Sequence, residues 1–144
     1  MSCVLRIGSE NFRVNEFLKE TKLEPYETHL LGEDLSVKRQ NYSKHTQNGC
    51  SFDLSTADFD RFDLQKKDTI EFLTKHFTEF KRLTEFGLGE IDKGTIDFAV
   101  YNRMQECMIQ SDYFEVELLK LAAELNFGIE ITQYFPGEED ERDA

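Results

Sequence analysis

The chain has no tryptophan, only two prolines and only three cysteines among its 144 residues. Cys3, Cys50 and Cys107 are odd in number and far apart, and no C-x-x-C pair occurs, which argues against a disulfide framework and a cysteine zinc site. No apolar run approaches the roughly 18 residues that cross a membrane. The first residues also lack the basic-then-apolar layout of a signal peptide. We therefore expect a soluble, cytoplasmic protein that does not contact membranes.

Catalytic and metal-binding motifs are also missing. No phosphate loop, G-x-G-x-x-G or G-x-S-x-G string occurs. An EF-hand loop starting at Asp58 needs glycine at its sixth position and glutamate at its twelfth, where this chain has Asp63 and Thr69. His29 and His45 fall in predicted loops at no metal-ligand spacing. We expect a non-enzyme without cofactor or metal, while a site assembled from scattered residues stays open.

Positive charge is scarce. The chain has 17 basic residues against 29 acidic ones, a net charge of −12. Residues 137–144 hold five acidic side chains against Arg142, a net of −4, so −8 of the −12 belongs to residues 1–136. We expect this tail to be disordered. An acidic surface repels nucleic acid and anionic lipid and attracts a basic protein, although acidity also serves solubility alone.

What the sequence does contain predicts a single α+β domain over residues 1–136. The hydropathy periods give the order β-α-β-β-α-β-α-β, with a mainly antiparallel sheet and helices packed on one face. The predicted strands are 3–8, about 35–39, 50–55, 95–101 and 129–134, and the helices are 14–22, 63–86 and 113–125. Asn48-Gly49 is a hairpin-turn signal, with residues 41–43 in the arm before it. Cys107–Gln110 is an additional short strand in one alternative.

Two helix features bear on function. Asp112 with Glu115 three residues later predicts a capping box at the start of the last helix. His76 lies within the apolar stripe of the long helix, where a lone histidine is either a packed residue or a functional one. Asp97, Glu130 and Tyr134 are, with His76, the suspects for a site assembled from separate elements.

Aromatic residues are frequent, with 13 phenylalanines and five tyrosines. Phe127, Tyr134, Phe135 and Tyr113 concentrate near the last helix and the last strand. If these side chains are exposed, they suit a protein interface; if they are buried, they belong to the core.

Several short strings follow one another along most of residues 3–135. They are Cys3-Val4-Leu5-Arg6-Ile7 with Phe12, Val14, Phe17 and Leu18, then Leu23-Glu24-Pro25, Leu31-Gly32-Glu33, Ile96-Asp97-Phe98, Leu118 to Leu125, and Gly128-Ile129-Glu130-Ile131-Thr132-Gln133-Tyr134. This series resembles the domain-of-unknown-function family numbered 4279, which comprises uncharacterised small bacterial proteins. The resemblance implies a strand, a short helix, an L-x-P turn and a polar hairpin, closed by a helix and a strand.

One departure from this family concerns tryptophan. Family members often carry a tryptophan in the second hairpin strand, and here Cys50 or Phe52 takes that place. The family has no established reaction or catalytic residues, so the resemblance implies a fold and no chemistry.

Three functional hypotheses follow from the sequence. The first is a non-catalytic protein-binding module with a basic partner, of which an immunity protein that blocks a basic toxin is the most concrete version. The second is an enzyme or small-ligand binder that uses the four suspects named above. The third is a regulatory domain that acts through self-association.

Overall fold

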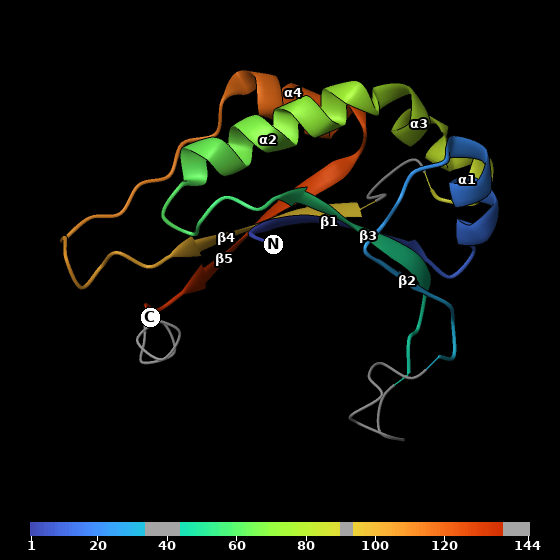
Figure 1. Cartoon of the computed structure of the whole chain (residues 1–144), viewed down its shortest axis with the longest axis horizontal. Helices are drawn as coiled ribbons and strands as arrows, with labels where there is room; N and C mark the ends of the chain where they lie inside the picture. Colours follow the sequence, from blue (N-terminus) through green and yellow to red (C-terminus); the bar gives the residue numbers. More distant parts are fainter. Residues whose placement is uncertain (34–43, 90–93, 137–144) are drawn as a thin grey trace.

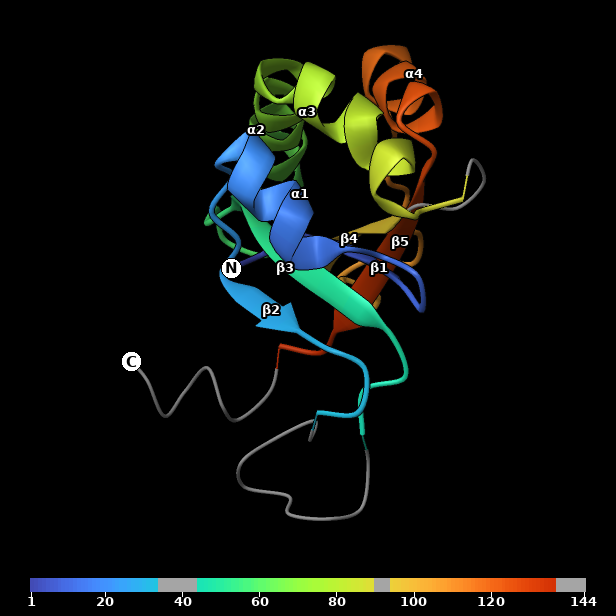
Figure 2. The same ribbon diagram turned by 90° about the vertical axis from the view of Figure 1, so that its right-hand side faces the viewer.

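In the computed structural model, which describes residues 1–33, 44–89 and 94–136, five strands form one sheet and the helices lie on one of its faces (Figures 1 and 2). The elements in chain order are β1 (Cys3–Ser9), α1 (Val14–Thr21), β2 (Glu27–His29), β3 (Asn48–Ser55), α2 (Phe62–Lys75), α3 (Phe77–Lys81), the 3-10 helix η1 (Arg82–Phe86), β4 (Gly94–Tyr101), α4 (Val116–Glu124) and β5 (Phe127–Tyr134). In the described parts, no helix is long and apolar enough to cross a membrane.

The strands lie in the order β2-β3-β1-β4-β5. Three neighbouring pairs are antiparallel, and β4 with β5 is parallel. Parallel neighbours need a crossover connection, and here the crossover consists of residues 102–115 followed by α4. The predicted α+β class, the mainly antiparallel sheet and the helices on one face are confirmed.

The two faces of the sheet follow the strand alternation. On β4, Ile96, Phe98 and Val100 have no exposed surface, whereas Thr95 and Asp97 on the other face are partly exposed. Only the first face packs against the helices. We call the second face the open face of the sheet.

Phenylalanine fills much of the core between the sheet and the helices. Its fully buried members are Phe12, Phe17, Phe52, Phe80 and Phe98. Each such side chain contributes about 1.5–3 kcal/mol when it leaves water. Tryptophan is not needed to fill this core because paired phenylalanine rings do so.

The predicted single helix over residues 63–86 is interrupted at His76, which lies between α2 and α3 with φ −108° and ψ 22°. The interruption redirects the chain after α2 (Figure 1). Phe80 then packs edge-on against Phe52 of β3 and Phe127 of β5, at 5.6 and 5.7 Å between ring centroids. We attribute the interruption of the helix to these contacts with distant strands, which the hydrophobic periodicity of the helix segment does not predict.

Two strand predictions need comment. Asn48-Gly49 is not a hairpin turn: both residues lie in β3, where they pair with Ser9 and Gly8 of β1. The available partner strand keeps them extended. The second strand is β2 at Glu27–His29, while the strand predicted near 35–39, the arm at 41–43 and the tail at 137–144 lie outside the described residues.

Candidate functional site

A 14-residue loop, residues 102–115, connects β4 to α4 and is held by its own polar side chains. The backbone N–H of Arg103 donates to Oε1 of Gln110 at 2.8 Å, and the Arg103 guanidinium donates to Asp112 at 3.1 Å. The Gln110 amide donates to the carbonyl oxygen of Tyr101 and to Asp112. The side chains of Arg103, Gln110 and Asp112 therefore hydrogen-bond to one another, which gives the loop a defined shape.

The start of the loop is tied to the last strand. The backbone N–H of Asn102 donates to the carbonyl oxygen of Tyr134 at 2.8 Å, and the Asn102 side chain accepts from the N–H of Met104 at 2.8 Å. The second bond is an Asx turn, which fixes the direction in which the loop leaves the sheet.

Two sequence predictions fail in this loop. Cys107–Gln110 forms no strand, because the Cys107 N–H and thiol both turn back to the carbonyl oxygen of Arg103. Asp112 does not cap the last helix: α4 begins at Val116, and the Asp112 carboxylate binds Arg103 and Gln110 instead. A charged partner within the loop is a stronger ligand for this carboxylate than one helix N–H.

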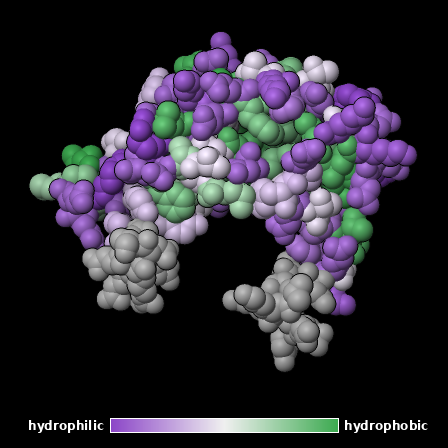
Figure 3. All heavy atoms as spheres, in the orientation of Figure 1, coloured by the Kyte–Doolittle hydropathy of each residue, from purple (hydrophilic) through white to green (hydrophobic). Residues whose placement is uncertain are grey.

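Most apolar side chains of the loop point to solvent, whereas Phe114 packs against the core. Met108 is 93%, Ile109 78% and Tyr113 69% exposed. Among the described residues, six of the twelve large hydrophobic side chains that are exposed lie between Met104 and Leu119. Figure 3 shows hydrophobic atoms at the left-hand tip, where this connection projects from the body. Concentrated exposed apolar residues are typical of interaction sites.

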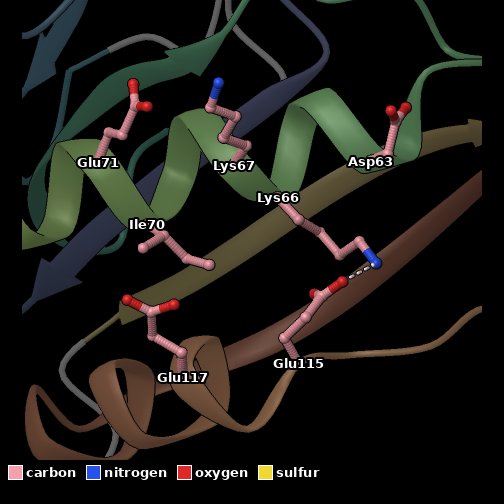
Figure 4. A pocket seen from close by; sticks show the side chains of 7 residues that line it. All are labelled: Asp63, Lys66, Lys67, Ile70, Glu71, Glu115 and Glu117. Atoms are coloured by element: carbon pink, nitrogen blue, oxygen red, sulfur yellow. Dashed lines mark hydrogen bonds and ion pairs between the residues drawn. The ribbon is translucent and has the colours of Figure 1, made fainter.

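A groove between α2 and α4 adjoins the end of the loop (Figure 4). Its volume is about 320 Å³, and it is lined by Asp63, Lys66, Lys67, Ile70, Glu71, Glu115 and Glu117. The ammonium of Lys66 donates to the carbonyl oxygen of Tyr113 at 2.6 Å and to Glu115 at 2.8 Å. This lysine, whose side chain is only 9% exposed, joins the loop to α2.

The groove is rich in carboxylates. The hydrogen bond from Lys66 lowers the pKa of Glu115 below its ordinary value. The other oxygen of Glu115, Oε2, is buried and has no hydrogen-bond partner among the described residues. In Figure 4 the Glu117 side chain extends toward Ile70 across the groove, while Lys67 and Glu71 point the other way. The groove therefore offers acceptors to a cationic or N–H donor.

Two of the predicted suspects meet on the open face of the sheet. Arg6 of β1 lies between Asp97 of β4 and Glu130 of β5 and donates to both at 3.0 Å. Thr132 also donates to Asp97 at 2.7 Å. The two carboxylates are held in a cross-strand ion-pair network, an arrangement that stabilises strand pairing.

The other two suspects lie elsewhere. Tyr134 is at the far end of β5, where its ring packs 5.3 Å from Phe59. His76 is on the helix side, with its ring 4.8 Å from that of Phe72. Because the sheet separates His76 from Asp97, the four suspects do not form one site.

Sequence reasoning missed several residues. Lys66 stands four residues after Phe62 and four before Ile70. This spacing places it on the apolar side of the helix, and its burial could have been predicted from that. His29 lies in β2 and not in a loop, and its ring stacks on His45 at 4.0 Å between centroids. The two histidines lie in separate segments of the chain, so the spacing of residues along the sequence does not predict their contact.

Comparison with known proteins gives one family. A family model described as Domain of unknown function (DUF4279) matches residues 1–136 of the 144. No curated protein and no solved structure matches the chain. The match agrees with the resemblance noted in the sequence. The chain belongs to the DUF4279 family.

Proposed function

We propose that this protein is a non-catalytic protein-binding module that binds a basic partner through the 102–115 loop and the adjoining groove between α2 and α4. One observation carries the proposal: the loop turns Arg103, Gln110 and Asp112 toward one another and exposes Met108, Ile109 and Tyr113. A water-exposed loop without a partner normally has the opposite arrangement.

The internal order of the loop favours tight association. Its shape is fixed by the Arg103–Asp112 and Gln110 hydrogen bonds before any partner arrives. Less conformational entropy is then lost on binding. Exposed aromatic and methionine side chains are enriched at the centres of protein interfaces, so Met108, Ile109 and Tyr113 are the proposed apolar anchors.

The charge of the partner follows from the groove and from the whole chain. The Glu117 carboxylate extends across the groove, and the net charge of the chain is −12. A lysine or arginine side chain of the partner fits this groove, and the long-range field speeds the encounter. An immunity protein that blocks a basic toxin is the concrete version of this proposal. The free cysteines are compatible with a place in the cytoplasm.

An enzyme or small-ligand binder built on Asp97 and Glu130 has less support. Arg6 occupies the space between the two carboxylates. A reaction that needs one of them as a base would first have to remove this arginine.

The test is capture of a partner from the native lysate, followed by titration with the purified partner. We expect a basic protein that binds at low salt and is weakened at high salt. Replacing Met108, Ile109 and Tyr113 together by serine should weaken binding more than about fivefold, the effect of a loss above 1 kcal/mol. Glu117→Lys should weaken it further at low salt.

The matched control replaces exposed apolar residues elsewhere, Tyr26→Ser with Leu31→Ser, which are 45% and 55% exposed. This variant should bind as the native protein does. The proposal is wrong if both sets of replacements weaken binding equally, if neither does, or if the captured partner is acidic.

A further inference from the structure

Glu27 and His29 of the edge strand β2 lie together with His45, at the opposite edge of the sheet from β5. One ligand atom from each side chain lies within 4.8 Å of the other two. The cluster combines two imidazole nitrogens with one carboxylate oxygen. This donor set suits zinc and related transition metals, whereas magnesium and calcium prefer oxygen alone.

The backbone fixes both parts of the cluster. Glu27 and His29 belong to β2, where they pair with Ser51 and Gly49 of β3. His45 is held by two backbone hydrogen bonds of 2.8 Å, one from its N–H to the carbonyl oxygen of Glu33 and one to its carbonyl oxygen from the N–H of Gly32. The side chains are thus presented by backbone that is itself hydrogen-bonded.

The position of His29 depends on a glycine. A Cβ atom at Gly49 would lie 2.7 Å from Nε2 of His29 and 2.5 Å from the carbonyl oxygen of Ile7. Such distances are too short for any real Cβ atom, so only glycine at position 49 lets the imidazole approach the sheet this closely.

A second, independent observation concerns the other ring nitrogen. Nδ1 of His29 is buried and has no hydrogen-bond partner among the described residues. An unpaired buried polar atom costs about 1–3 kcal/mol, so a ligand at this nitrogen would remove a penalty.

We propose that Glu27, His29 and His45 form a binding site for one divalent transition metal of the zinc class. Tetrahedral zinc with ligands at about 2.0–2.1 Å sets neighbouring ligand atoms about 3.3 Å apart. The stacked rings, with an interplanar angle of 13°, must therefore tilt, and the ligand atoms must close by at most about 1.5 Å from their 4.8 Å limit. The fourth position is left for water or another ligand.

The test is a calorimetric titration of the full chain with Zn²⁺ near neutral pH. We expect one ion per chain. His29→Ala and His45→Ala should each weaken zinc binding more than about tenfold, because losing a ligand costs at least as much as losing a supporting group. Glu27→Gln keeps the shape of an exposed side chain and should also weaken binding. Binding should raise the melting temperature of the native protein and not of the two histidine variants.

The matched control is His76→Ala, which removes a histidine from the helix layer and should leave zinc binding unchanged. Cys107→Ser should also leave it unchanged, which excludes the exposed thiol as the ligand. Circular dichroism checks that every variant is folded. The proposal is overturned if the native chain binds no zinc, if His29→Ala and His45→Ala bind it as tightly as the native chain, or if His76→Ala loses it as well.

Discussion

Lys66 is the residue on which the candidate site depends most directly. Its side chain lies along α2, its ammonium is 4.6 Å from the centre of the Phe62 ring, and it ends between Tyr113 and Glu115. A lysine is rarely this buried unless its charge is paired. Lys66 therefore stabilises the fold and positions the end of the 102–115 loop at the same time.

We predict that Lys66→Ala lowers the free energy of unfolding by about 1.5–3 kcal/mol, the range for a hydrogen bond to a charged group. The carbonyl oxygen of Tyr113 and the Glu115 carboxylate lose their donor in this variant. Lys67→Ala, on the next residue and directed away from the groove, should change stability by less than about 0.5 kcal/mol. Urea denaturation followed by circular dichroism measures both, and equal effects would contradict the role of Lys66.

The pH dependence of stability tests the same ion pair. In the folded protein the Lys66 hydrogen bond lowers the pKa of Glu115 below its ordinary 4.5. The ionised pair therefore contributes its full stability above pH 4.5 and loses it as the pH falls through the lowered pKa. The stability difference between the native protein and Glu115→Gln should be largest near neutral pH and should disappear in acid. A difference that grows in acid would show that the pair is not responsible.

At the scale of elements, the 102–115 loop departs furthest from the sequence-based prediction. The apolar pair Met108-Ile109 resembles a short buried strand, but it is among the most exposed parts of the described chain. The sequence could not reveal this, because exposure depends on where Arg103, Gln110 and Asp112 direct the loop.

We predict that Asp112→Ala loosens this loop without unfolding the domain. The Arg103 guanidinium and the Gln110 amide lose a shared acceptor. The amides of residues 103 and 104 should exchange hydrogen about tenfold faster, which corresponds to about 1.4 kcal/mol less protection. Mass spectrometry of exchanged peptides measures this change.

Glu106→Ala serves as the control, because Glu106 is exposed in the same loop. Its exchange rates should equal those of the native protein. If Asp112→Ala instead accelerates exchange throughout β4 and α4, the carboxylate supports the whole domain and not the loop in particular.

At the scale of the whole molecule, one face of the sheet is apolar and covered by the helices, and the other face is polar. The buried side of β1 and β3 includes Cys3 and Cys50, both with no exposed surface, while Cys107 is exposed in the loop. Burial raises the pKa of Cys3 and of Cys50 to about 12. We therefore expect these two thiols to react only when the protein unfolds.

We predict that, near pH 8, a thiol reagent labels one cysteine rapidly and the other two only at the rate of global unfolding. Counting labels by mass spectrometry, with and without denaturant, measures this. Cys107→Ser should abolish the fast phase and leave the slow phase intact. Two or three rapid labels in the native protein would mean that the sheet does not protect its thiols as described.

The sequence alone determined the features that depend on local chemistry. The alternation of Ile96, Phe98 and Val100 with polar residues fixed a strand and its buried face, because the side-chain period of a strand is two. The apolar residues before His76 recur at spacings of three and four, which predicts a helix because an α-helix has 3.6 residues per turn. The acidity and the family resemblance were also visible without coordinates.

Only the tertiary structure decided how distant residues meet. It placed Lys66 on Glu115, 49 positions along the chain, Arg6 between Asp97 and Glu130, and His29 against His45. It also interrupted the long helix at His76, where Phe80 finds its partners on two strands. These arrangements depend on which elements become neighbours in the sheet and the helix layer, and local periodicity carries no information about that choice.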